Sequence, residues 1–315
     1  MSSSARPKIL YRPSSLQYPV LAMVEEFRLW QEFGLDPDLE LQVETEIAER
    51  RLIEGDAQLV IGNHITPHAD RARGIPIVYL AQATNWAEEW LVSKDSKVRG
   101  LTDLKGKRIA AGTVVDDHPT LTTRLRMERA GLEPERDGIQ FIPIASYPMA
   151  QVEAVRDGKV DAAVVMAPYD LKARRWGLNV VDIPKVPMVW GLTVTALSPF
   201  ALRNEEFIKG VIKAISKGIY YFKTRRGDAL EVLKEKLGRK MSLDTEEELD
   251  YFYDYMTRAL ENKLYPTLEA IQNVYRLALF NYPEARQLNP LTMWDLHYVR
   301  EVDEEGFFDR LWRGA

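Results

Sequence analysis

Short apolar runs alternate with polar loops and basic amphipathic stretches along the first 183 residues. The run AQLVIG at 57–62 is followed by a polar loop, a basic stretch, Gly74 and a second apolar run, IPIVYLAQA. The run DAAVVMA at 161–167 is followed by the same features in the same order, with Gly177 in the place of Gly74. Short buried runs joined by helical stretches are typical of β-α-β units in a parallel sheet.

The same repeat extends upstream of both runs. KILY at 8–11 leads through a polar loop into a predicted helix over 19–33 that ends at a Gly-Leu pair, and KRIAAG at 107–112 leads into a predicted helix that also ends at Gly-Leu. One β-α-β-α-β plan therefore occurs at 8–83 and again at 107–183. Two similar lobes would form a cleft, and clefts between domains are where small ligands bind.

The periodicity changes after residue 204. Long helical patterns over 205–221, 228–237, 245–258 and 267–279 predict a helical extension that packs on the outside of the first lobe. The sequence therefore predicts a two-lobed α/β fold. Residues 1–90 and 190–315 form the first lobe with its C-terminal helices, and residues 91–189 form the second.

Composition narrows the classes of function. A length of 315 residues suits two domains, and a formal net charge of -5 argues against a nucleic-acid binder. The chain has no Cys, which removes disulfides, thiolate metal sites and a cysteine nucleophile. No run approaches the ~18 apolar residues of a membrane helix. The N-terminus lacks the apolar core of a signal peptide, which predicts a cytoplasmic protein as written, or a periplasmic one if a leader has been removed.

Four loops are nominated by their position after predicted strands. They are 12–18, 62–64, 112–118 and 167–170, and ligands of an open parallel sheet bind beyond the carboxyl ends of its strands. A helix begins after each loop, so its first backbone N–H groups suit an anion. The candidate ligand-binding residues are Arg12, Ser14, Ser15, Tyr18, Asn63, His64, Gly112, Thr113, His118, Tyr169 and Trp190.

Each kind of candidate has a second, structural interpretation. The serines could cap the first helix as well as bind an anion. Arg12 could bind a carboxylate through both of its terminal nitrogens, or it could be a surface charge. The aromatic residues could line a cleft and favour a flat or cationic ligand, or they could be packing residues.

Three of the four histidines, His64, His68 and His118, lie in or beside these loops. Together with Asp117 they leave three possibilities open. The first is hydrogen bonding and helix capping, the second is acid–base chemistry near neutral pH, and the third is a divalent metal held by the three histidines. Nothing else in the sequence predicts a cofactor.

Five phrases carry a resemblance to a known family: FGLDPDLELQV at 33–43, EGDAQLVIG at 54–62, IPIV at 75–78, LTDLKGKRIAAG at 101–112 and DGKVDAAVVMAP at 157–168. Over residues 8–240 the chain resembles the type II periplasmic binding proteins of the NMT1/THI5-like group, which includes sulfonate, nitrate and pyrimidine-precursor binding proteins. The resemblance implies two α/β lobes, two crossing strands and a small-molecule ligand held by strand-end loops. It also implies an ABC importer, whose permease is then the partner.

Two functions follow from this resemblance. The first is a binding protein of the importer type for a small anionic or aromatic ligand. The second is a cytosolic lyase on the same fold, such as an aromatic-acid decarboxylase that resembles the 4,5-dihydroxyphthalate decarboxylases, in which Asp117 and His118 face His64 and deliver a proton. The desulfinases and pyrimidine synthases of this fold use cysteines that the chain lacks.

Overall fold

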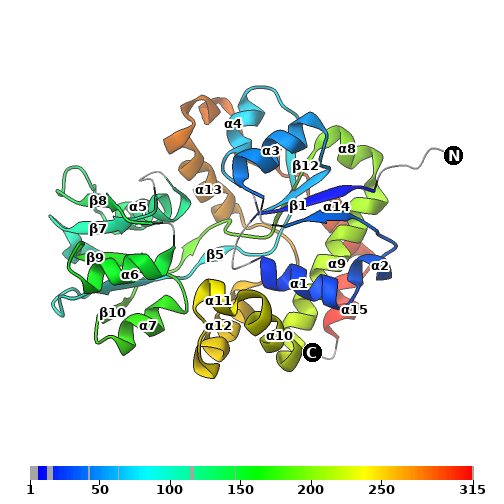
Figure 1. Cartoon of the computed structure of the whole chain (residues 1–315). Helices are drawn as coiled ribbons and strands as arrows, with labels where there is room; N and C mark the ends of the chain where they lie inside the picture. Colours follow the sequence, from blue (N-terminus) through cyan, green and yellow to red (C-terminus); the bar gives the residue numbers. More distant parts are fainter. Residues whose placement is uncertain are drawn as a thin grey trace. The chain divides into compact units, whose positions relative to one another are not determined.

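A computed structural model describes residues 6–12, 17–41, 43–62, 64–113, 117–145 and 147–313. The described residues divide into two compact units, Met1–Trp86 with Pro187–Ala315, and the continuous stretch Ala87–Val186 (Figure 1). The predicted boundaries lie a few residues from these. The chain passes between the units twice, through strands β5 (Trp86–Ala87) and β11 (Val186–Pro187), which pair with each other in a two-stranded sheet of the described chain.

The first unit is built on a mostly parallel sheet. Its described strands are β1 (Lys8–Tyr11), β2 (Asp38–Glu40), β3 (Leu59–Ile61), β4 (Ile77–Gln82) and β12 (Thr193–Leu197). Their order in the sheet is β2-β1-β3-β12-β4, with β1 parallel to β2 and β3, and with β12 antiparallel to β3 and β4. The antiparallel strand is the one that follows the second passage between the units.

The second unit repeats this arrangement. Its described strands are β6 (Trp90–Ser93), β7 (Arg108–Ala111), β8 (Gln140–Pro143), β9 (Ala162–Val165) and β10 (Asn179–Asp182). Their order is β8-β7-β9-β6-β10, and β6, which follows the first passage, is again the antiparallel member. The sequence repeat is therefore matched strand for strand, and the predicted two-sheet α/β fold is confirmed.

Helices lie on both faces of each sheet (Figure 1). The described helices of the two repeats are α1 (Tyr18–Glu26), α2 (Leu29–Glu32), α3 (Thr45–Glu54), α4 (Pro67–Ala72), α5 (His118–Arg129), α6 (Pro148–Arg156) and α7 (Tyr169–Arg175). A short 3-10 helix covers Leu101–Leu104. Because both faces are covered, every residue of β3 and β9 is buried, which explains their uninterrupted apolar sequence.

The predicted helix over 19–33 is interrupted. Phe27 ends α1, and Arg28 adopts the left-handed region at φ 50° before α2 begins. The guanidinium carbon of Arg225 lies 4.7 Å from the centre of the Phe27 ring, so a cation from the C-terminal helices covers the break. Helical periodicity continues across the interruption, which is why the apolar pattern alone does not reveal it.

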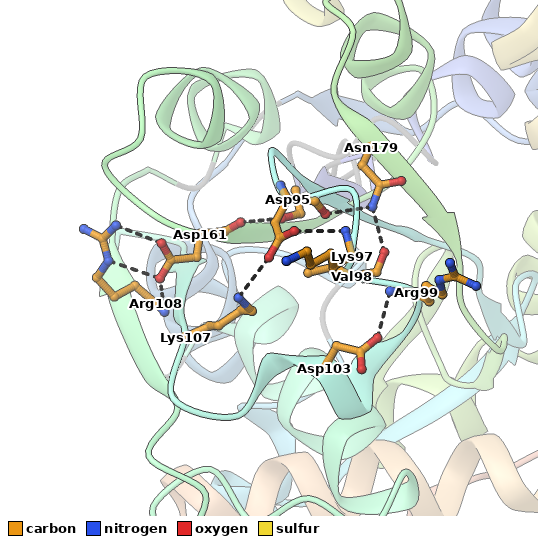
Figure 2. A network of polar contacts seen from close by, with 10 residues as sticks. Asp95, Lys97, Val98, Arg99, Asp103, Lys107, Arg108, Asp161 and Asn179 are labelled. Atoms are coloured by element: carbon orange, nitrogen blue, oxygen red, sulfur yellow. Dashed lines mark hydrogen bonds and ion pairs between the residues drawn. The ribbon is translucent and has the colours of Figure 1, made fainter.

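Asp56 and Asp161 occupy equivalent positions in the two repeats, shortly before β3 and β9. Each forms an ion pair at the edge of its sheet where the parallel strands begin. The Nζ atom of Lys8 lies 3.3 Å from Asp56 Oδ1. Arg108 donates to both carboxylate oxygens of Asp161, at 3.2 and 2.9 Å (Figure 2). The network in Figure 2 continues through Lys107 and Asp95, 3.5 Å apart. The most regular sequence feature of the repeat is therefore structural, and it lies at the amino ends of these strands.

The C-terminal region is helical, as predicted. Its described helical segments are α8 (Ser198–Arg203), α9 (Glu205–Thr224), α10 (Arg226–Val232), a π-helical turn (Leu233–Leu237), α11 (Gly238–Met241), α12 (Glu246–Ala259), α13 (Leu268–Asn281), two 3-10 turns (Pro283–Gln287 and Pro290–Met293), α14 (His297–Glu304) and α15 (Phe307–Trp312). The long helix α9 packs on α1, where a Cβ atom at Gly218 would lie 2.5 Å from Val24. Among the described residues, no helix combines the length and apolar character needed to cross a membrane.

Candidate functional site

The loops at the carboxyl edge of the first sheet are joined by backbone hydrogen bonds. Arg12, just after β1, donates its N–H to the Ile61 carbonyl at 3.0 Å, and Gly62, just after β3, donates to the Thr193 carbonyl at 2.9 Å. Since β12 runs antiparallel, its first residue Thr193 lies at the same edge as the ends of β1 and β3. The segments after β1 and β3 and before β12 therefore meet.

Gln17 holds these three segments together. Its side chain is fully buried, and its amide nitrogen donates to the Arg12 carbonyl and to the Ile61 carbonyl. Its amide oxygen accepts from the N–H of Leu192 at 3.3 Å. A Cβ atom at position 62 would lie 2.2 Å from this amide, and Gly62 has φ +104°, so the loop after β3 requires glycine.

A second buried network fixes the turn before β12. Gln82 donates to the Gly191 carbonyl at 2.8 Å and accepts from the Thr193 hydroxyl at 2.6 Å. The hydroxyl oxygen of Thr84 accepts from the Gly191 N–H at 2.9 Å. These bonds hold Leu192 in the left-handed region at φ 53°. Trp190, a predicted ligand contact, is half-buried immediately before this turn.

Arg12 is a half-buried cation at the end of β1. Its Nε atom is buried and has no hydrogen-bond partner among the described residues, and no ion pair of its guanidinium occurs within them. Burial lowers the pKa of Arg12, and the charges of Glu44 and Glu49 partly oppose that change. A cation withdrawn from water without a bound counter-ion is a position where a ligand anion would be stabilised.

The histidines of the first unit have different surroundings. His64 is buried in the loop after β3. His68 lies inside α4, where its Nδ1 is 3.1 Å from the Ile65 carbonyl oxygen and its ring is 5.7 Å from the rings of both Tyr79 and Tyr275. Burial lowers the pKa of His68 to about 4. No group of three or more histidine or carboxylate side chains able to hold a metal ion occurs among the described residues.

In the second unit, Asp117 is the N-cap of α5. Its carboxylate accepts from the Thr120 N–H at 3.0 Å, and the Thr120 hydroxyl accepts from the Gly112 N–H at 3.2 Å. A Cβ atom at Gly112 would lie 1.3 Å from the Asp117 carboxylate. The protein's own carboxylate therefore binds at the N-terminus of α5, where the sequence had suggested a ligand anion. Half-buried His118 is the first residue of this helix.

Two tyrosines form a pair at the same edge of the second sheet. Tyr169 begins α7 after the cis Ala167–Pro168 peptide, and its ring lies 5.8 Å from that of Tyr147 at an interplanar angle of 82°. Tyr169 is buried, whereas Tyr147 is exposed. Burial raises the pKa of Tyr169, and the hydrogen bond and charge of Tyr147 add to the rise. Gln151 donates to the carbonyls of Ala111 and Ala145, joining the loops after β7 and β8.

The predicted residues thus fall into three sets. Arg12, Tyr18, His64 and Trp190 belong to the first unit, and Gly112, Thr113, Asp117, His118 and Tyr169 belong to the second. Ser14, Ser15 and Asn63 lie outside the described residues. The sequence analysis missed the residues that hold the loops in place, which are Gln17, Gln82, Thr84, Leu192 and Gln151. A glutamine inside an apolar run is the signal that could have revealed two of them, Gln82 and Gln151.

The first unit also contains a cavity of about 550 Å³ between α9, α12 and the loop before α13. Its lining includes Lys223, Arg258, Glu261, Lys263 and Tyr265. None of the predicted site residues lines this cavity.

Comparison with known proteins places the chain in a family. Residues 29–226, more than half of the chain, match the family described as NMT1/THI5 like. A protein of Escherichia coli (strain K12) that is named for binding aliphatic sulfonates is 28% identical over 187 residues, which cover 58% of this chain and only 57% of that protein.

Two solved structures share the fold over nearly the whole chain. The periplasmic aliphatic sulphonate binding protein of Escherichia coli superimposes with a TM-score of 0.71 at 17% identity, covering 92% of this chain and 97% of that one. The alkanesulfonate-binding protein of Xanthomonas axonopodis pv. citri, bound to MOPS, gives a TM-score of 0.60 at 18% identity, covering 92% and 96%. The chain belongs to the NMT1/THI5-like family and has the fold of a type II periplasmic binding protein.

Proposed function

We propose that this protein is the ligand-binding component of an ABC-type importer, and that its ligand is a small organic anion such as a sulfonate. Membership of the NMT1/THI5-like family supports the binding role. Both solved relatives described above are named for sulfonate binding, and MOPS, the ligand in one of them, carries a sulfonate group. The importer's permease would be the partner.

The observation that carries the proposal is the state of Arg12. Its half-buried guanidinium lies at a carboxyl strand end and has no ion pair among the described residues, although Glu44 and Glu49 are close enough to influence its pKa. A guanidinium presents parallel N–H groups that match two oxygens of a carboxylate or sulfonate. A bound anion would supply the counter-charge that the described chain leaves out.

The aromatic side chains support an organic rather than an inorganic anion. Trp190 is half-buried beside the turn before β12, and Tyr147 is exposed against Tyr169 in the second unit. Flat apolar surfaces next to a few fixed polar groups are typical of small-molecule sites. We expect the sulfonate to bind at Arg12 and its carbon chain or ring to contact Trp190, which belongs to the same unit.

Calorimetry with ethanesulfonate, butanesulfonate, benzenesulfonate and the matching carboxylates tests the proposal. Replacing Arg12 by Gln should weaken binding by about 10- to 100-fold, since a hydrogen bond to a charged group contributes roughly 1.5–3 kcal/mol. Arg50→Gln, an exposed arginine of α3 in the same unit, is the matched control and should bind as the unaltered protein does. Absence of binding by every sulfonate, or equal affinities for Arg12→Gln and the unaltered protein, would contradict the proposal.

The decarboxylase alternative remains a prediction of the sequence analysis. It can be tested by incubating the protein with hydroxylated aromatic acids and analysing the mixture by mass spectrometry. Recovery of every acid unchanged would support a binding protein. Turnover that disappears in both His64→Ala and His118→Ala would replace the binding proposal by a lyase.

A further inference from the structure

Both passages between the units are anchored by one buried arginine of the second unit. Arg126, in α5, is 2% exposed, and its Nη2 donates to the Ala87 carbonyl at 2.7 Å. Its Nη1 donates to the carbonyl of Pro184, shortly before β11. The carboxylate of Glu89, 4% exposed, accepts from the same Nη2 at 3.0 Å. One guanidinium therefore binds the first and the second passage together.

On the side of the first unit, two asparagines anchor the same passages. Asn85 donates its side-chain amide to the Tyr265 carbonyl at 2.8 Å and accepts from the Thr267 N–H at 3.0 Å. Asn273, buried in α13, donates to the Pro187 carbonyl at 2.7 Å. The Asn85 carbonyl accepts from the Met188 N–H at 2.8 Å, which joins the two passages to each other.

Only a short stretch of each passage lies between these anchors. In the first passage it is Trp86, which is exposed. In the second it is Lys185 and Val186, of which Lys185 makes a 2.9 Å ion pair with Glu88 near the surface. Such an exposed pair contributes little to holding a backbone in place, whereas buried charge-assisted hydrogen bonds contribute more. The stretch between the anchors also includes the pairing of β5 with β11, to which Trp86 and the buried Val186 belong.

The arginine also links the passages to a candidate ligand loop. Arg126 and His118 belong to the same helix, and eight residues at 1.5 Å each separate them by about 12 Å along the helix axis. Asp117 caps the start of that helix. A displacement of Asp117 or His118 by a ligand would therefore be carried by a rigid element to the point where both passages are bound.

We propose that Arg126 is a positioning residue for ligand binding, because it fixes both passages to α5 next to the place where β5 and β11 pair. The inference rests on the proposed function, since it takes the loop at the start of α5 to be a ligand loop. Arg126 acts through the backbone of the passages and is not itself a ligand contact.

The first test needs no ligand. In Arg126→Lys the positive charge beside Glu89 remains, but a single ammonium cannot replace the planar fork that reaches two carbonyls and a carboxylate at once. We expect backbone amides in 84–90 and in 183–189 to exchange with deuterium at least about tenfold faster than in the unaltered protein, and strands β7 and β9 to exchange as before. The method is hydrogen exchange followed by mass spectrometry.

Two further variants make this test decisive. Arg129→Lys applies the same chemical change to an exposed arginine on the same helix and should leave both segments unchanged. Glu89→Gln keeps both carbonyl contacts of Arg126 and should accelerate exchange much less than Arg126→Lys. Faster exchange in only one passage, faster exchange throughout the second unit, or an equal effect of Glu89→Gln would each overturn the proposal.

The second test adds the sulfonate that calorimetry shows to bind most tightly. At saturating ligand the unaltered protein should show slower exchange in both segments, and Arg126→Lys should lose at least half of that protection and bind about tenfold more weakly. Full protection and full affinity in Arg126→Lys would overturn the positioning role while leaving the binding function intact. If no sulfonate binds the unaltered protein, the proposed function fails, and the ligand-free test still decides whether Arg126 fixes the passages.

Discussion

At the scale of single residues, His68 makes stability depend on pH. The folded protein keeps this buried imidazole neutral down to about pH 4, whereas the unfolded chain takes up a proton near pH 6.5. The unfolded state therefore binds more protons between these values, and stability falls as the pH is lowered through that window. From pH 7 to pH 5 we expect a loss of about 2 kcal/mol from His68 alone.

His68→Gln is the substitution that isolates this effect. A glutamine can still donate to the Ile65 carbonyl but does not titrate, so the variant should lack that part of the pH dependence even if it is less stable at pH 7. Urea unfolding of both proteins at pH 7 and pH 5 measures the difference. An identical loss of stability in the two proteins would assign the pH dependence to other groups.

The sequence predicts which residues lie in the strand-end loops better than it predicts which residues fix those loops by hydrogen bonds. Arg12, His64 and Tyr169 could be placed next to strand ends because apolar runs alone locate the strands. Gln17 was missed because a glutamine in a polar loop has no local signature, and its partners at Ile61 and Leu192 are distant in sequence. Burial of a polar side chain is decided by tertiary contacts, which periodicity does not contain.

At the scale of elements, the start of α5 depends on a fit between Gly112 and Asp117. Replacing Gly112 by Ala would put a methyl group where the capping carboxylate lies, so the variant should lose the cap and be destabilised by about 1 kcal/mol or more. In an Asp117→Ala background the same change should cost little, because the carboxylate is already gone. Urea unfolding of the four proteins of this double-mutant cycle gives the coupling, which we expect to be about 1 kcal/mol.

Gly100→Ala is the control for this cycle. It adds the same methyl group in the second unit at a position with open space around it, and it should leave stability nearly unchanged. Equal losses from Gly112→Ala with and without Asp117 would show that the glycine is needed for some reason other than the cap.

At the scale of the whole molecule, the β-α-β-α-β repeat accounts for three parallel strands of each sheet and does not predict the antiparallel strand that enters each sheet from a passage between the units. Strands β6 and β12 follow the two passages, and each enters the sheet of its unit antiparallel to its neighbours. Apolar runs at 90–92 and 187–197 indicate strands at both positions. The neighbours with which such a strand pairs depend on the whole sheet, because the strand lies outside the repeat.

The same topology predicts that Ala87–Val186 folds by itself. This unit contains its own core of buried residues, including Leu91, Ile109 and Ala162, and its sheet is complete without strands of the first unit. Its two ends are also held together, because Arg126 binds the carbonyls of both Ala87 and Pro184. A unit of this size should unfold cooperatively with a free energy of about 5 kcal/mol.

Circular dichroism and urea unfolding of this fragment check the expectation, and a shorter fragment, residues 98–186, supplies the matched control. The shorter piece lacks β6, which pairs with both β9 and β10 in the middle of the sheet, so β10 would lose its partner and the core would lose Leu91. We expect a sigmoidal transition for the longer fragment and none for the shorter. If neither fragment unfolds cooperatively, the second unit depends on the first for its stability, and the division of the chain into two independently folding units is wrong.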